Sequence, residues 1–422
     1  MISWRFAGTG LFLLALALRA GWVLSQWTRH SGTAQFPDEV LHWQLATNLI
    51  EQGALVSDDG RYAARMPGYP AFLAIFAALG TIGPLLAKLA QALLGAVTAW
   101  AGYAWMRQCG GIRAGLVAGA LIALDPYNVF FSNLLLTEVI FTLAAVGFAW
   151  STWQLSERGN ALPPGGCAVT CTPADAGAGS MSLWFAFLGV TLVFLRPSAA
   201  GWIALAWGMI ACWGGSRRQR LNALGVAITT MVIAMTFWGM RNMNVLGAPT
   251  LLSANGGITL YDAQGPQADG SSNQEFMQAL PELVDKSELE RDRYLQQRAL
   301  EEMKRDPLRV VQLAGVKFLR TWNPLPNYER YRGGAAAIVG AGYTVILLAG
   351  FLVALRKMRE HPRLFVALLL PIAYFTFLHM IYIGSVRYRV PLMPLLALCF
   401  ALNFMPRSLA QDRTAMNEHA GS

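Results

Sequence analysis

The chain has 422 residues, of which 55% are hydrophobic and only 14% are charged, and its 33 Lys and Arg against 24 Asp and Glu give a net charge of +9. Soluble domains carry about 25% charged residues, so this composition excludes a disordered chain and argues against a simple soluble globule. The basic residues lie in short clusters between long apolar runs, which is not the pattern of a nucleic-acid-binding surface. The five cysteines form no paired framework, which argues against a disulfide scaffold.

Ten apolar runs are candidates for membrane spans, because a helix needs about 20 mostly apolar residues to cross a bilayer. We place these runs at 6–26, 84–106, 114–132, 135–155, 182–196, 198–215, 221–240, 333–355, 363–383 and 389–406. The first run is long and contains Arg19, so we interpret it as a retained helix rather than a cleaved signal peptide. The sequence therefore predicts an all-α polytopic membrane protein with about ten transmembrane helices.

The orientation follows from the short basic loops, which face the cytoplasm in membrane proteins. With ten spans, the basic stretches at 107–113, 217–220 and 356–363 all fall on the side of the N-terminus. The long segments 28–83 and 241–332 then face outward.

The apolar stretch 67–83 is short and begins with prolines, so we expect it to form a helix lying in the outer interface. The cytoplasmic loop 156–181 contains Cys167 and Cys171, which lack further ligands for a metal site. The predicted organisation is a transmembrane module, an outer region, C-terminal transmembrane helices and a cytoplasmic tail, at 1–240, 241–332, 333–406 and 407–422.

Acidic residues lie at two places where apolar runs meet the predicted outer water. Asp38 and Glu39 follow Pro37 at the start of an amphipathic helical stretch, and Glu138 lies near the start of the run 135–155. An ionisable group beside a membrane span is costly unless it is satisfied or used. Each position can also be explained as a helix cap or a solvated helix start. Together, the acids at these two places predict that carboxylates act as a general base or as metal ligands in one outer cavity.

Basic residues are expected near the same surface, at Arg65, Lys88, Arg196, Arg387 and Arg389. Guanidinium forks match phosphate oxygens, although headgroup anchoring and snorkelling would also place bases here. Outer bases beside outer acids fit a reaction with a phosphate leaving group and a hydroxyl nucleophile. In that reaction the bases stabilise the developing phosphate charge and an acid takes the hydroxyl proton.

Metal ligands are only weakly indicated. His42 falls one helical turn after Asp38 on the same face, which would suit a shared metal ion. His379 lies inside a span, where a packed and hydrogen-bonded histidine is the simpler interpretation. We therefore predict no cofactor and no metal site; a divalent metal, if bound, would use Asp38, His42 and Glu138.

Six motifs in order resemble the polytopic GT-C glycosyltransferases, and within them the bacterial relatives of protein O-mannosyltransferases and of the aminoarabinose transferase that modifies lipid A. The motifs are PDEVLHWQLATNLIEQG from Pro37, RYAARMPGYP from Arg61, LTEVIF from Leu136, FLRPS from Phe194, SANGGITLY from Ser253 and RYRVPLMP from Arg387. The likeness extends from about residue 5 to residue 406. Each motif is weak alone, but the ordered set is specific for the superfamily and says little about the substrate.

The resemblance implies an enzyme that takes a sugar from a polyprenyl-phosphate carrier and passes it to an acceptor on the outer face of a bacterial plasma membrane. Asp38 matches the catalytic base, Glu138 matches a second acid, and Glu39 would support Asp38. Arg65, Arg196 and Arg387 match basic positions near the carrier phosphate. A loop that closes the cavity is matched by Asn255, Gly256, Gly257 and Tyr261.

The implied partners are a polyprenyl-phosphate-linked sugar, a glycan, lipid or protein acceptor, and the bilayer, with no nucleic acid. Transfer would invert the anomeric carbon. An alternative is a transporter or flippase for an amphipathic or anionic solute, which would need ionisable groups along a midplane path. Arg19 and Asp125 are the only such groups deep in the predicted spans. A third hypothesis is a non-catalytic scaffold.

Overall fold

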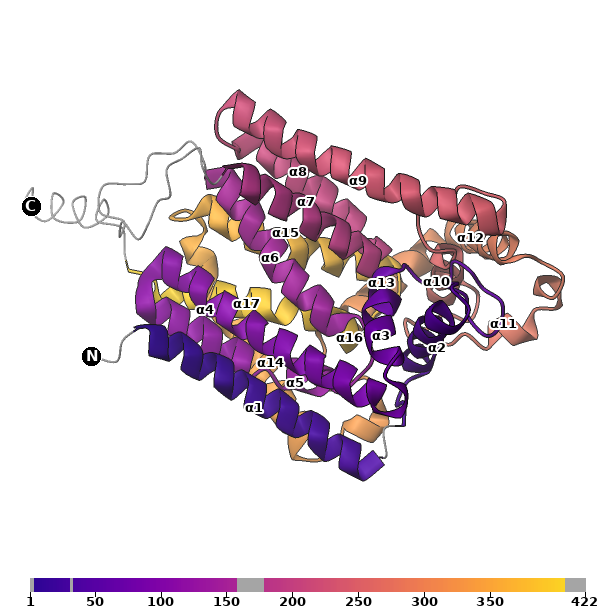
Figure 1. Cartoon of the computed structure of the whole chain (residues 1–422), viewed down its shortest axis with the longest axis horizontal. Helices are drawn as coiled ribbons and strands as arrows, with labels where there is room; N and C mark the ends of the chain where they lie inside the picture. The colour runs from indigo at the N-terminus through magenta and orange to yellow at the C-terminus, as the bar shows by residue number, and fades with distance from the viewer. Residues whose placement is uncertain (1–3, 31–32, 158–177, 407–422) are drawn as a thin grey trace, which may run out of the picture.

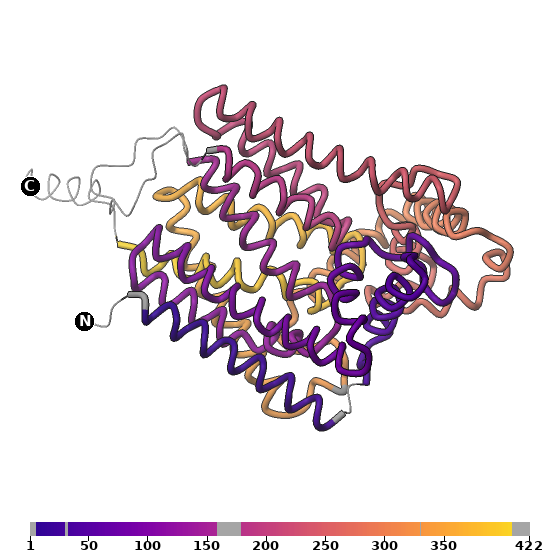
Figure 2. The backbone as a smooth tube through the Cα atoms, in the orientation of Figure 1, coloured from indigo at the N-terminus to yellow at the C-terminus, as the bar shows by residue number. Residues whose placement is uncertain are grey.

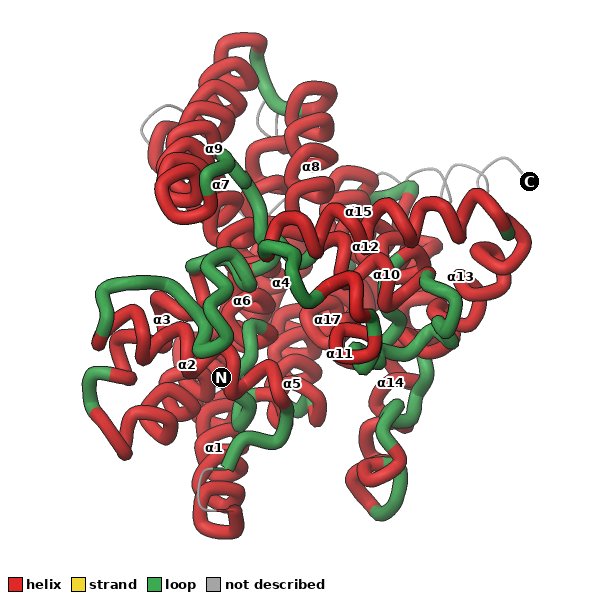
Figure 3. Tube along the Cα trace, turned by 90° about the vertical axis from the view of Figure 1, so that its right-hand side faces the viewer, coloured by secondary structure: helices red, strands yellow, loops and turns green. Residues whose placement is uncertain are grey.

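The structure is a computed structural model that describes residues 4–30, 33–157 and 178–406. These residues form α-helices, short 3₁₀ turns and loops, with no β-strand among them (Figure 3). The helices of the bundle are α1 (Trp4–His30), α4 (Gly83–Ala123), α6 (Glu138–Glu157), α7 (Ala178–Leu195), α8 (Ala200–Trp213), α9 (Arg217–Leu246), α14 (Ala335–Ala354), α15 (Pro362–Ile381) and α17 (Met393–Ala401). The predicted all-α class is confirmed.

Six helices in the described part of the chain are long and apolar enough to cross a membrane: α1, α4, α6, α9, α14 and α15. The protein is therefore a multi-pass membrane protein, as predicted, whereas the predicted number of ten spans is not confirmed. The runs 182–196 and 198–215 form the shorter helices α7 and α8. The run 389–406 is divided among the end of α16 (Val386–Arg389), two 3₁₀ turns and α17.

The interior of the bundle is built around α6 and α17. α6 packs against α4, α7, α8 and α15, while α17 packs against α4, α14 and α15. The side chains of α17 are buried almost without exception, from Met393 to Ala401. This complete burial explains why its sequence is apolar on all sides although the helix is short.

The predicted spans 84–106 and 114–132 are joined in one bent element. α4 bends at Gly111, whose φ of 79° lies in the left-handed region that favours glycine. The element then stops at Ala123, and a separate short helix, α5 (Pro126–Phe131), completes the second run. The prediction of an unbroken span over 114–132 is therefore wrong.

Two buried charges satisfy the backbone at this break. Arg19 in α1 donates to the carbonyls of Ile122 and Ala123 at 2.9 Å, at the end of α4. Asp125 is the N-cap of α5 and accepts from the N–H groups of Tyr127 and Asn128. A cation at a helix C-terminus and an anion at an N-terminus both oppose the partial charges there. Free backbone groups are costly in hydrocarbon, so the two charges make this break possible.

Arg19→Met is expected to lower the midpoint of thermal unfolding in detergent by several degrees. The change leaves two buried carbonyls without donors, and each such loss costs about 1–3 kcal/mol. Tryptophan fluorescence would follow the unfolding. The matched control is Arg29→Met in the same helix, because Arg29 is exposed. Equal midpoints for both variants would show that Arg19 does not hold the break together.

Two of the longer segments between the bundle helices, 33–82 and 247–334, gather at the end of the molecule opposite the first and last described residues (Figures 1 and 2). They contain α2 (Pro37–Glu51), α3 (Gly68–Ala77), α10 (Gly256–Gln264), α11 (Phe276–Ala279), α12 (Glu288–Arg305) and α13 (Pro307–Trp322). α3 lies within the predicted interfacial stretch 67–83, but it has only ten residues.

The two long segments that were predicted to face outward are bonded to each other. The Glu288 carboxylate accepts from the N–H groups of Tyr62 and Ala63 at 2.8 and 3.0 Å. Arg241 donates to the carbonyls of Tyr62 and Leu55. The Ala254 N–H donates to the Ala63 carbonyl at 2.8 Å. These bonds hold the stretch that leads to Arg65 in place.

Candidate active site

Glu39 fixes the first turn of α2 against the loop that precedes α6. One of its carboxylate oxygens accepts from the N–H groups of Gln35 and Phe36, at 2.8 and 3.1 Å. The other accepts from the N–H group of Leu135 at 2.8 Å. Phe36 is the N-cap of α2 and Asp38 is its second residue, so the capping interpretation of Asp38 is wrong.

Glu39→Gln is expected to lower the free energy of unfolding by about 1–3 kcal/mol. The glutamine NH₂ group would replace one carboxylate oxygen. It would then face the backbone N–H of Leu135 or those of Gln35 and Phe36, and two donors cannot bond to each other. The matched control, Glu51→Gln, makes the same change at the exposed end of α2. If the two variants have the same free energy of unfolding in detergent, the Glu39 hydrogen bonds do not stabilise the contact between the start of α2 and the loop before α6.

Asp38 is held by two arginines from distant parts of the chain. Arg65 Nη2 donates to Asp38 Oδ1 at 2.8 Å, and Arg387 Nη1 donates to Oδ2 at 2.5 Å. The Asp38 side chain remains 33% exposed. Burial would raise the pKa of this carboxyl, but Arg387 and Arg65 outweigh burial and hold the pKa well below its usual range. Asp38 is therefore an ionised acceptor at neutral pH.

Glu138 lies at the start of α6 and its side chain is fully buried. Its Oε1 atom accepts from Arg387 Nε and from Arg196 Nη2, the latter at 2.7 Å. Arg196 Nε also donates to Thr137 Oγ1 at 2.7 Å. Arg387 thus bridges Glu138 and Asp38, although 349 positions separate it from Asp38.

We call Asp38, Arg65, Glu138, Arg196 and Arg387 the charged cluster. Its members come from α2, the loop before α3, the start of α6, the turn between α7 and α8, and α16. The pKa of Arg387 lies well above its ordinary value, because Glu138 and Asp38 outweigh the burial that would lower it. The cluster can bind an anion, since the Arg65 and Arg387 side chains are about a quarter exposed.

Two of the predicted phosphate-binding bases lie outside these ion pairs. Arg389 is fully buried and donates to the carbonyls of Thr321 and Asn323 and to Thr344 Oγ1. Residues two positions apart on a helical turn do not share a face. Arg387 and Arg389 therefore contact different sets of residues. Lys88 is buried in α4, with its Nζ atom 5.9 Å from the ring centre of Trp27.

The predicted substrate loop is a helix in the outer region. Asn255 is the N-cap of α10, and Tyr261 packs edge-on against Phe276 in a small apolar core. The N–H group of Gly257 donates to Asp292 Oδ1 at 2.7 Å. A Cβ at Gly257 would collide with the Asp292 carbonyl of α12, whereas one at Gly256 would meet open space. These residues thus belong to a packed helix rather than a loop, and their role in closing the cavity stays a prediction.

Metal ligands do not assemble within the described residues, where no three His, Cys, Asp or Glu side chains lie together. Asp38 and Glu138 instead share a guanidinium group. Cys167 and Cys171 fall outside the described residues.

Comparisons with known proteins bear on the fold. No family model and no curated protein matches the sequence. The structure matches the archaeal oligosaccharyltransferase AglB from Archaeoglobus fulgidus, in complex with an inhibitory peptide and a dolichol-phosphate, over 95% of this chain and 50% of that chain. The TM-score is 0.50 and the sequence identity is 16%. This chain has the GT-C fold.

Other solved structures were also found, and at these identities similarity establishes the fold alone. The apo form of the Archaeoglobus enzyme matches 95% of this chain and 50% of that chain, with a TM-score of 0.50 and 15% identity. The present chain thus spans about half the length of the oligosaccharyltransferase. ArnT from Cupriavidus metallidurans bound to undecaprenyl phosphate matches 94% of this chain and 76% of that chain at 14% identity. Its TM-score of 0.39 is too low to support an inference.

Sequence reasoning missed a set of bonded polar residues that lies beside the first turns of α2. Tyr69 donates its hydroxyl to Gln91 Oε1 at 2.8 Å, and the Gln91 amide donates to the Leu134 carbonyl at 2.8 Å. Tyr69 also lies edge-on against His42, with ring centres 4.9 Å apart. The polar Gln91 inside an apolar run was the one available signal, because such a group needs a partner in hydrocarbon.

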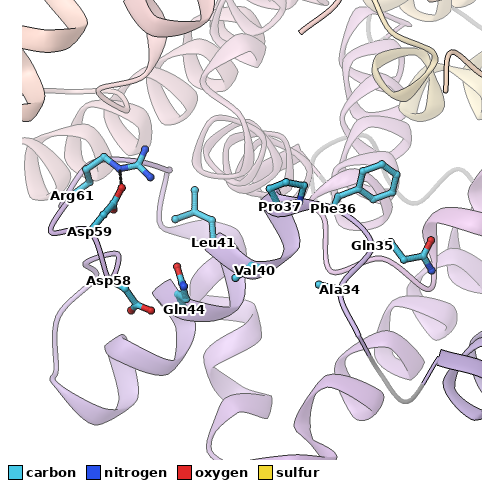
Figure 4. Close-up of a pocket in the computed structure, with 10 residues that line it drawn as sticks. All are labelled: Ala34, Gln35, Phe36, Pro37, Val40, Leu41, Gln44, Asp58, Asp59 and Arg61. Carbon is cyan, nitrogen blue, oxygen red and sulfur yellow. Dashed lines mark hydrogen bonds and ion pairs between the residues drawn. The ribbon is translucent and has the colours of Figure 1, made fainter. Parts of the chain in front are cut away.

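A cavity of about 600 Å³ opens beside the first two turns of α2 (Figure 4). Figure 4 shows Pro37, Val40, Leu41 and Gln44 along one side of it, facing the turn that carries Asp59 and Arg61. The charged cluster does not line this cavity. Because Asp38 is the neighbour of Pro37, cavity and cluster occupy adjacent faces of one helical turn.

Proposed function

We propose that this chain is an integral-membrane glycosyltransferase that moves a sugar from a polyprenyl-phosphate carrier to a hydroxyl acceptor. The observation that carries the proposal is the charged cluster, in which two carboxylates share three guanidinium groups. Two further points support it. AglB, which has the same fold, was solved with a dolichol-phosphate. The helices α2 and α16, which carry Asp38 and Arg387, also lie at the end of the bundle where α3, α10 and α12 gather (Figure 1).

In the proposed reaction, the acceptor oxygen attacks the anomeric carbon and the bond from that carbon to the carrier phosphate breaks. Asp38 receives the hydroxyl proton, and the bonding electron pair leaves with the phosphate. Arg65 and Arg387 stabilise the charge that develops there. Attack from the side opposite the leaving group inverts the anomeric carbon.

Donor binding has to precede activation of Asp38. In the free protein both oxygens of Asp38 accept from arginines, which keeps its pKa low and makes it a poor base. A phosphate competes with Asp38 for these guanidinium groups, because it is an anion with more acceptor oxygens. Drawing Arg65 or Arg387 toward the phosphate would free one carboxylate oxygen for the acceptor hydroxyl.

Glu138 would hold the phosphate-binding arginines in position rather than exchange protons. Its Oε1 atom is bonded to both Arg196 and Arg387. Full burial leaves it without direct access from bulk water. Glu39 would act through Leu135 and the first turn of α2, as a positioning residue between the two carboxylates.

We place the site on the outer face of a bacterial plasma membrane. Arg107 lies beside the bend of α4 at Gly111, Arg217 begins α9, and Arg356 follows α14. These places are at the end of the bundle away from α2, α3 and α16 (Figure 1). Short basic loops of this kind stay in the cytoplasm. The acceptor would be a glycan, lipid or protein of the cell envelope.

Transport is not favoured by any observation in the described residues. The two deep charges that the transporter hypothesis would use, Arg19 and Asp125, are bonded to helix ends. Both side chains bind backbone groups at the break between α4 and α5. They are therefore not available to bind a solute along a path through the membrane.

Lipid mass spectrometry of a strain that lacks the gene tests the proposed function. The expected result is accumulation of a polyprenyl phosphate that carries one sugar, with loss of that sugar's mass from one envelope component. Unchanged carrier lipids and unchanged envelope glycans, in cells that make the protein normally before deletion, would contradict the proposal.

A further inference from the structure

Two polar atoms beside the charged cluster are buried without a hydrogen-bond partner among the described residues. They are His42 Nδ1 and Glu138 Oε2. The His42 side chain lies one turn beyond Asp38 in α2 and is 3% exposed, and Glu138 is fully buried. Arg387 joins Asp38, one turn before His42, to Glu138, so the two groups lie on either side of the same guanidinium group.

Buried polar side-chain atoms need hydrogen-bond partners, and these two are set apart from the other unpartnered atoms by their place beside an anion site, where a polar ligand can supply the partner. Glu138 Oε2 is an acceptor. Burial and the Arg65 charge lower the pKa of His42 to about 3, so its imidazole is neutral. Neutral imidazole accepts or donates at Nδ1 according to its tautomer. A hydroxyl group has one proton, so it bridges the two atoms when Nδ1 carries the ring hydrogen: the hydroxyl then accepts from Nδ1–H and donates to Glu138 Oε2.

The charges of the cluster restrict the ligand further. Three guanidinium groups face two carboxylates, which leaves one positive charge. Buried Lys88 and Glu39 carry one charge of each sign, so they leave this sum unchanged. The single negative charge of a phosphodiester donor would neutralise the cluster. A protonated amino group on the sugar would add an uncompensated charge in a largely buried place, which is costly.

We infer that the donor sugar is neutral, and that one of its hydroxyl groups binds between His42 Nδ1 and Glu138 Oε2. This inference rests on the proposed function and names the class of sugar that the site accepts. The carrier phosphate occupies the arginines, and the hydroxyl pocket lies beside it, next to Tyr69.

Competition binding with the purified full chain in lipid vesicles tests the inference. The probe is radiolabelled undecaprenyl phosphate, and the competitors are undecaprenyl-phosphate-linked mannose, glucose, arabinose and 4-amino-4-deoxyarabinose. At pH 7 we expect at least one neutral-sugar donor to compete about tenfold better than the amino-sugar donor. An amino-sugar donor that competes as well as the best neutral donor overturns the inference and leaves the proposed function standing. If no undecaprenyl phosphate binds at all, the proposed function fails instead.

His42→Phe separates a ligand contact from packing, because phenylalanine keeps the ring against Tyr69 and removes Nδ1. We expect it to weaken the best neutral donor about fivefold and to leave undecaprenyl phosphate unchanged. The matched control is Thr321→Val, which removes another buried unpartnered atom, Thr321 Oγ1, far along the chain beside Arg389. It should change neither affinity. Equal weakening of the donor and of undecaprenyl phosphate by His42→Phe would show that His42 only supports the fold and would overturn the assignment.

Discussion

Asp38→Asn is expected to lower sugar transfer by roughly 10²- to 10⁴-fold, the usual contribution of a general base. Asparagine has the same shape, but it cannot take the acceptor proton. The variant should bind undecaprenyl phosphate at least as tightly as the native protein, because Arg65 and Arg387 lose the carboxylate that competes with the phosphate. Transfer rates and carrier binding, measured on protein in vesicles, check both parts.

Glu51→Gln is the control for this variant, since it makes the same acid-to-amide change at the exposed end of α2. It should transfer sugar at the native rate. A fully active Asp38→Asn protein would remove Asp38 as the base. A variant that loses transfer together with carrier binding and thermal stability would instead assign Asp38 a structural role.

Arg387→Ala is expected to weaken donor use by tenfold or more, and by more than Arg65→Ala. Hydrogen bonds to charged groups are typically worth about 1.5–3 kcal/mol. Arg387 bridges Asp38 and Glu138, whereas Arg65 contacts Asp38 alone among the acids of the cluster. Removing Arg387 also leaves the buried Glu138 with Arg196 as its one cationic partner in the cluster. Donor KM and carrier affinity measure the effect.

The control for the arginine variants is Arg61→Ala. Arg61 pairs with Asp59 at 2.8 Å in the same loop and contacts no member of the charged cluster. Its removal should leave donor KM unchanged. Donor kinetics that are native in both Arg65→Ala and Arg387→Ala would eliminate the phosphate-binding role of the cluster.

The long helices could be predicted from the sequence because hydropathy alone determines them. The runs 333–355 and 363–383 correspond closely to α14 and α15. The run 114–132 was misjudged because its break depends on a tertiary contact. Arg19 reaches the end of α4 from another helix, and no local pattern near Asp125 reveals that partner.

The candidate site was predictable in its residue types but not in its pairing. Asp38, Glu138 and Arg387 stand out as charges at the ends of apolar runs, and the structure joins them through one guanidinium group. Arg389 has the same surroundings in sequence as Arg387, yet it caps the end of α13. Two side chains that are two positions apart on a helical turn point in different directions. The apolar residues around Arg387 and Arg389 do not indicate which of the two arginines points toward Asp38.

Reconstituted transfer tests the central claim most directly. Purified protein in vesicles would be mixed with an undecaprenyl-phosphate-linked neutral sugar, labelled at the anomeric carbon, and with an envelope extract. The account predicts that free undecaprenyl phosphate appears in step with labelled sugar on one extract component, and that the label has inverted configuration. Donor that stays intact while it crosses the vesicle membrane, or product with retained configuration, would contradict it.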